Sequence, residues 1–131
     1  MLRRRRLGEL RESLREGQRV MVPWEIWTSD FPFEGAHPCV LFSNTARLAN
    51  PAFDRVNVLL CRTLRGPLQR ELRAAEVLLD RADGLDWETL CRVNSLHFVP
   101  KSALRERRGL VCKERRRIIS QRMLQLFPLE F

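Results

Sequence analysis

The spacing of hydrophobic residues changes twice along the chain and divides it into three parts. In residues 1–18, leucines recur at helical spacing within a polar, basic stretch, which predicts a short amphipathic helix. From residue 19 onward, short runs of β-branched and aromatic residues alternate with turn signals, a pattern typical of β-strands. Helical spacing returns over residues 113–127. We therefore expect a basic helical extension at residues 1–18 and one β-rich domain at residues 19–131 that ends in a helix.

The β-rich part contains five predicted strands. They are expected at residues 20–28, 37–43, 56–64, 71–79 and 89–99. Pro23 places the first strand at an edge or a bulge, because proline cannot donate a ladder hydrogen bond. The fourth strand is the least regular, since its alanines and glutamates also suit a helix. A short helical turn is predicted at residues 102–107, so the element order favours a mostly β fold, a compact antiparallel barrel capped by the C-terminal helix.

The C-terminal helix carries one apolar stripe that we expect to pack on the sheet. The stripe consists of Ile118, Ile119, Met123, Leu126 and Phe127. Arg115, Arg116 and Arg122 fall outside this stripe.

Charge adds a class of partner to this picture. The 131 residues include 24 Lys and Arg against 16 Asp and Glu, a formal net charge of +8, and the isoelectric point is about 10.8. Such a surface attracts polyanions, above all nucleic acid. All basic residues except Lys101 and Lys113 are arginines, which bind phosphate bidentately and stack on bases. A coding bias would explain the choice of Arg over Lys, but not the net excess.

Cysteine and histidine positions give no sign of a metal site. Cys39, Cys61, Cys91 and Cys112 form no Cys-x-x-Cys pair, and the two histidines lie far from any metal-type spacing. The first three cysteines lie in apolar runs and are expected in the core. The basic start of the chain lacks the apolar stretch of a secretory signal. We therefore expect a cytoplasmic protein with reduced thiols, no metal and no cofactor.

Four segments, in order along residues 19–127, resemble the PemK/MazF toxins. They are Trp24–Pro32, His37–Asn44, Val58–Thr63 and Asn94–Leu104. The resemblance implies a five-stranded, SH3-like antiparallel barrel with a C-terminal helix, here with an extra N-terminal helix. It also implies a homodimeric toxin that acts as a metal-independent, sequence-preferring endoribonuclease on single-stranded RNA and is held inactive by a cognate antitoxin protein.

The same resemblance points to catalytic candidates and to two departures. Thr63 matches the hydroxyl that ends the family's third strand, and Arg92 matches an arginine of some members. His37 stands where the family has an arginine before proline. Asn94 stands in place of the family's acidic residue, and His97 in place of the following arginine. Thr63, Arg92 and the two histidines are therefore the catalytic candidates.

These residue types suit metal-free RNA cleavage. The reaction needs a base for the 2′-hydroxyl proton, an acid for the leaving 5′-oxygen, and cations or donors that stabilise the phosphorane. Histidine serves either proton role near neutral pH. The predicted substrate-binding residues are Arg62, Arg65, Asn94, Ser95 and Trp27, with the tryptophan as a base-stacking aromatic.

Two other functions remain open at this point. The altered arginine and acidic positions also suit a catalytically degenerate relative that binds nucleic acid or a partner protein. A weaker alternative is a barrel relative that poisons a topoisomerase. Each histidine on a strand also has an ordinary structural interpretation, as a half-exposed bystander.

Overall fold

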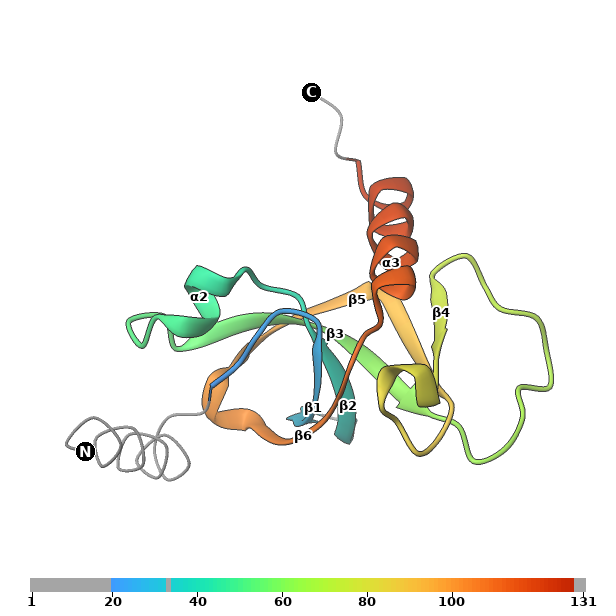
Figure 1. Cartoon of the computed structure of the whole chain (residues 1–131), viewed down its shortest axis with the longest axis horizontal. Helices are drawn as coiled ribbons and strands as arrows, with labels where there is room; N and C mark the ends of the chain where they lie inside the picture. Colours follow the sequence, from blue (N-terminus) through green and yellow to red (C-terminus); the bar gives the residue numbers. More distant parts are fainter. Residues whose placement is uncertain (1–19, 33, 129–131) are drawn as a thin grey trace, which may run out of the picture.

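One curved antiparallel sheet with a C-terminal helix forms the body of the molecule (Figure 1). The computed structural model describes residues 20–32 and 34–128, so the helix predicted at residues 1–18 lies outside the described residues. The mostly β class, the antiparallel pairing and the C-terminal helix are confirmed. Within the described residues, no helix is long and apolar enough to cross a membrane.

The sheet of the described chain has six strands, in the order β4-β5-β3-β2-β1-β6. The strands are β1 Glu25–Phe31, β2 Gly35–Leu41, β3 Arg55–Thr63, β4 Glu76–Leu79, β5 Thr89–Pro100 and β6 Leu104–Leu110. β4 and β6 are the edges, so this sheet curves without closing into a hydrogen-bonded barrel. The strand number is therefore six where the sequence predicted five.

The unpredicted strand is β6, which pairs with β1. Its sequence is rich in arginine and poor in β-branched residues, so local preference gives it little support. Ion pairs to β1 hold it instead: Arg105 lies 2.9 Å from Asp30, and Arg107 pairs with the buried Glu25. The helical turn predicted at residues 102–107 is confirmed only as the 3-10 segment η2, Lys101–Ala103, directly before β6.

Two further segments differ from the prediction. The loop after β2 contains a short helix, α2 Thr45–Ala49, whose N-cap Asn44 accepts a 2.8 Å hydrogen bond from the Arg47 amide. The predicted fourth strand at residues 71–79 is a strand only over Glu76–Leu79. Its first half instead belongs to a long connection that leaves the sheet after β3 (Figure 1).

The curved sheet separates two apolar clusters. Side chains alternate between the faces of each strand, so neighbouring residues enter different clusters. One contains Met21, Trp27, Phe31, Cys39, Leu41, Leu48, Val56, Val58, Leu60, Val99 and Leu104. The other contains Ile26, Val40, Leu59, Cys61, Val77, Leu79, Leu85, Cys91, Val93, Val111 and Ile119. The three predicted core cysteines are therefore buried, and burial raises the pKa of the Cys39 thiol to about 12.

Helix α3, Lys113–Leu126, packs against β4 and β5 and rises from the sheet (Figure 1). Of its predicted stripe, Ile119 is fully buried, and Ile118 and Met123 are partly buried against the second cluster. Leu126 is 38% exposed, so within the helix the stripe covers the sheet only as far as Met123.

The helix arginines outside the apolar stripe anchor α3. Arg115 binds both oxygens of Asp80 at 2.7 and 2.9 Å and also pairs with the buried Asp83 of the 3-10 segment η1, Arg81–Asp83. This pairing lowers the pKa of Asp80. Arg116 and Arg122 donate to the carbonyl oxygens of Val111 and Ala74 at 2.7 and 3.2 Å.

Candidate functional site

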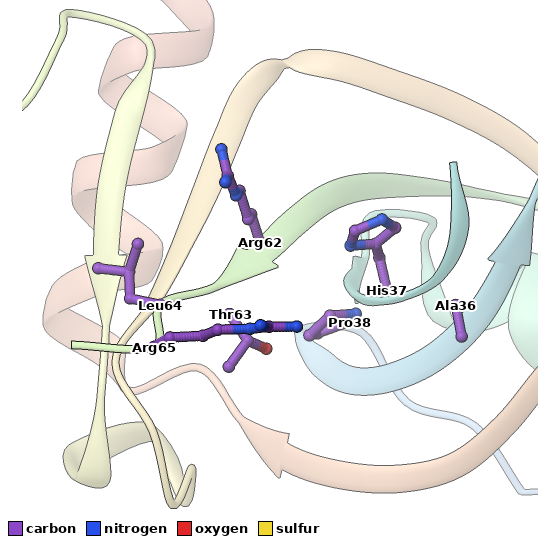
Figure 2. A pocket seen from close by; sticks show the side chains of 7 residues that line it. All are labelled: Ala36, His37, Pro38, Arg62, Thr63, Leu64 and Arg65. Atoms are coloured by element: carbon purple, nitrogen blue, oxygen red, sulfur yellow. The ribbon is translucent and has the colours of Figure 1, made fainter. Parts of the chain in front are cut away.

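An open pocket of about 460 Å³ lies where β2 begins and β3 ends (Figure 2). Three residues of β2 and four at the end of β3 line it: Ala36, His37, Pro38, Arg62, Thr63, Leu64 and Arg65. The pocket therefore brings together four predicted site residues, two of them catalytic candidates and two of them predicted phosphate-binding arginines.

Strand register explains this meeting. β2 and β3 are antiparallel neighbours that pair from Leu41 opposite Val58 to Cys39 opposite Leu60. Beyond that last pair, the start of β2 and the end of β3 lie at the same edge of the sheet, which brings His37 and Arg62 to one pocket. Figure 2 shows His37 and Arg62 on one side, with Arg65 extending across the pocket toward Pro38.

A backbone carbonyl fixes the proton arrangement of His37. Its Nε2 lies 2.8 Å from the carbonyl oxygen of Glu34, in the turn before β2. A carbonyl oxygen only accepts hydrogen bonds, so Nε2 must carry the hydrogen and donate it. In the neutral ring Nδ1 is therefore the nitrogen that can accept a proton. The half-buried ring is thus held with a defined tautomer.

Phe31 connects the two histidines. Its buried ring lies 6.5 Å from the His37 ring and 5.1 Å from the His97 ring, measured between centroids. His97 itself does not line the pocket, and its Nε2 lies 3.1 Å from the hydroxyl oxygen of Ser95. His97 and Ser95 thus form a polar pair next to the Phe31 ring and outside the pocket lining.

The remaining candidates on β5 lie outside the pocket. The β3–β5 register shifts between Leu59 and Cys61, and Arg92, Asn94 and Ser95 fall in the corresponding irregular stretch of β5. Arg92 is half-buried opposite Glu76 of β4, and Asn94 is exposed. The structure therefore does not bring these three residues to the pocket wall.

Trp27 requires a correction. It was predicted to stack on RNA, but its side chain is only 6% exposed and belongs to the first apolar cluster. Its indole nitrogen donates to the buried Glu25 carboxylate at 3.4 Å. Its side chain lies on the face of β1 that also carries Phe31 and packs into that cluster, which removes its ring from the surface. It is a core residue.

Cationic charge at the pocket comes from exposed arginines. Arg62 and Arg65 are exposed, and neither takes part in an ion pair among the described residues. Arginines without a carboxylate partner keep their donors available for a phosphate. In the same part of the chain, no three His, Cys, Asp or Glu side chains gather closely enough to hold a metal ion.

Two contributors to this site were hard to predict from the sequence. The Glu34 carbonyl has no side-chain signature, because it is a backbone atom in a hairpin turn. Phe31 is a core residue whose ring also lies close to both histidines, and only the ring distances of the folded chain show this. Alternation from Trp27 through Ser29 to Phe31 was the available signal, since these three residues share a face.

No family model matches the chain, and no curated protein matches it. Solved structures do. A mycobacterial endoribonuclease in complex with its cognate antitoxin is 18% identical with a TM-score of 0.68, covering 85% of this chain and 98% of that one. Mycobacterium tuberculosis toxin MazF-mt6 is 17% identical with a TM-score of 0.66, covering 82% and 99%. MazE–MazF from Deinococcus radiodurans is 12% identical with a TM-score of 0.64, covering 85% and 98%. These likenesses confirm the resemblance at the level of the fold.

Proposed function

We propose that this chain, which has the MazF fold, is the toxin of a toxin–antitoxin pair and a metal-independent endoribonuclease that prefers certain sequences in single-stranded RNA. One observation carries the proposal: a single pocket is lined by His37, Thr63 and two arginines outside any described ion pair. These groups supply a proton acceptor, a hydroxyl donor and fixed positive charge. Metal-free phosphodiester cleavage needs that combination.

In the proposed reaction the 2′-oxygen attacks the adjacent phosphorus. His37 Nδ1 takes the 2′-hydroxyl proton, the new O–P bond forms, and the bond from phosphorus to the 5′-oxygen breaks. The leaving oxygen receives a proton from the imidazolium or from water. The products are a 2′,3′-cyclic phosphate and a free 5′-hydroxyl, so atoms and charge balance without an added cofactor.

The other pocket residues act on the phosphate. Arg62 lines the same pocket as His37, which suits it to a non-bridging oxygen beside the reacting 2′-hydroxyl. The Arg65 side chain extends across the pocket toward Pro38, which suits it to contact the RNA phosphate from a second direction (Figure 2). The Thr63 hydroxyl donates to a phosphate oxygen. His97, Ser95, Asn94 and Arg92 would contact flanking nucleotides, because they lie on β5 outside the pocket wall.

Partners follow from the solved structures of the same fold. Two of them are complexes of an endoribonuclease or MazF with an antitoxin, one named as cognate and one as MazE. We propose that a cognate antitoxin likewise binds and inhibits this chain. A homodimer is also proposed, on the resemblance to the PemK/MazF toxins.

The direct test is incubation of purified protein with a defined RNA in EDTA, followed by mapping of both new ends. We expect cleavage at preferred sites that leaves a cyclic phosphate and a 5′-hydroxyl. Cleavage that requires a divalent cation would contradict metal independence. A wild type that binds RNA and cuts none of a varied set would favour the binding-module alternative.

Two variants link the activity to the pocket. His37→Ala and Thr63→Ala should each lower the cleavage rate by about 10²- to 10⁴-fold, the usual effect of losing a proton-transfer or transition-state-stabilising group. Thr45→Ala is the matched control, because Thr45 is an exposed threonine of α2 outside the pocket. Undiminished cutting by both pocket variants would remove these residues from the active site.

A further inference from the structure

The most exposed aromatic side chain of the described residues is Trp87, in the turn that leads into β5. Its exposed fraction is 62%, against 51% for Phe98 and 43% for Phe53. Both phenylalanine rings already have a partner, since the Arg47 guanidinium lies 5.2 Å from the centroid of Phe98 and 4.4 Å from that of Phe53. Among the described residues, no such ring contact involves Trp87. Both faces of this indole are therefore open to a ligand, unlike the rings of the two phenylalanines.

Trp87 lies beside the pocket. β3 and β5 pair through Thr63 and Thr89, and one step further the Leu64 amide donates to the Glu88 carbonyl at 2.9 Å. Leu64 itself lines the pocket, so Trp87 directly precedes a residue that is hydrogen-bonded to the pocket wall. Figure 1 shows the turn before β5 next to the arrow tip of β3.

The turn that carries Trp87 is fixed on both sides. Before it, Gly84 ends η1 in the left-handed region with φ of 81°, and Leu85 is buried at 6% exposure. After it, the Thr89 hydroxyl donates to the Trp87 carbonyl at 3.1 Å. The indole is therefore presented on an ordered backbone, so little further ordering is needed when a ligand binds.

We infer that Trp87 is the platform on which an unpaired base of the bound RNA stacks, next to the phosphate held by Arg62 and Arg65. The inference rests on the proposed ribonuclease function. Every base has a π-face, and aromatic side chains provide such platforms in proteins that bind single strands. Its role is specificity and positioning, because the indole has no group that could move a proton in the reaction.

Neighbouring charge favours a base over the sugar-phosphate backbone at this position. Asp86 and Glu88, on either side of Trp87, are exposed carboxylates that repel phosphate. The arginines that attract phosphate lie on β3 and just beyond it. The sugar-phosphate backbone of the RNA therefore follows Arg62 and Arg65, while one base turns toward the indole. A protein partner would use the indole without needing those arginines.

The test measures equilibrium binding without cleavage. All-2′-O-methyl oligonucleotides lack the attacking hydroxyl, so homopolymers and mixed sequences of this type can be titrated by anisotropy. Trp87→Ala should weaken binding roughly 5- to 150-fold, the equivalent of ~1–3 kcal/mol for one stacked base. Trp87→Phe should restore most of the affinity. Phe98→Ala is the control: its ring is similarly exposed and lies opposite Asn57, away from the Thr63 end of β3.

The salt dependence separates stacking from phosphate contact. Trp87→Ala should leave the slope of log affinity against log salt unchanged, whereas losing one phosphate contact lowers it by ~0.7 for a single strand. A lowered slope in Trp87→Ala would overturn the inference. Wild-type binding that Trp87→Ala does not weaken would overturn it alone and assign the indole to a protein partner. A wild type that neither binds nor cuts any RNA would overturn the proposed function as well.

Discussion

His37 differs from the two arginines of the pocket because a neutral imidazole has a ring nitrogen that can accept a proton, whereas a guanidinium has only donors. Its Nε2 is committed to the Glu34 carbonyl, which leaves Nδ1 for the reaction. His37→Arg restores positive charge and donors but removes the proton acceptor. We expect this variant to bind RNA about as tightly as the wild type and to cut it about 10²- to 10⁴-fold more slowly. Retained cutting would show that His37 acts by charge alone.

Glu76 holds the connection between β3 and β4 in place. Its side chain is only 5% exposed and binds Arg70 through two hydrogen bonds of 2.6 and 2.7 Å. The Arg73 amide adds a third bond of 2.8 Å. The hydrogen bonds from Arg70 lower the pKa of Glu76 from its ordinary 4.5 to about 2. Folding therefore favours the ionised form.

A depressed pKa in the folded state contributes stability at pH values above 4.5, and that contribution disappears as the pH falls toward 2. Glu76→Gln should therefore lower the melting temperature at pH 7, and the gap to the wild type should narrow steadily between pH 4.5 and 2. Glu71→Gln, at an exposed neighbour, should follow the wild-type curve. A gap independent of pH would refute this linkage.

At the residue scale, the sequence predicted the pocket wall better than its surroundings. His37, Arg62, Thr63 and Arg65 lie near the ends of two strands joined by a simple register, so their order along the chain determines their meeting. Arg92 could not be placed, because an irregularity in β5 has no signature in the sequence. Trp27 was misplaced because strand alternation alone does not tell which face is buried.

At the scale of elements, helix α3 depends on a few contacts. Ile119 is fully buried, whereas Leu124 of the same helix is 65% exposed. Ile119→Ala should lower the free energy of unfolding by about 2–5 kcal/mol, because it removes buried methyl groups and leaves a cavity. Leu124→Ala should change it by no more than about 0.5 kcal/mol. Urea unfolding of both variants checks this, and equal losses would mean that the helix packs differently.

Edge strand β6 shows why the strand number was not predictable. Its sequence favours no strand, yet Gly109 allows it to pass against the η1 turn, where a Cβ would collide with the Asp83 carbonyl oxygen. Ion pairs from Arg105 and Arg107 to β1 complete the fit. These are tertiary interactions, which override local preference. Strand β3, by contrast, was predictable, because residues 58–61 are all buried and so form a continuous apolar run.

At the scale of the whole molecule, the net charge of +8 acts through a subset of its arginines. Arg70, Arg105, Arg107 and Arg115 are paired with carboxylates, so they hold the fold. Arg62 and Arg65 belong to none of the ion pairs of the described chain and line the pocket. The attraction for RNA should therefore come from unpaired arginines rather than from total charge.

This division of the arginines can be measured as a salt dependence. Wild-type affinity for single-stranded RNA should fall linearly on a log–log plot against salt, because each neutralised phosphate releases counterions. Arg62→Ala and Arg65→Ala should each lower the slope by ~0.7. Arg55→Ala is the matched control, since Arg55 is an exposed arginine at the opposite end of β3. Equal slope changes in all three variants would mean that RNA responds to the overall charge and not to the pocket. A wild-type affinity that does not change with salt would contradict phosphate binding by arginine altogether.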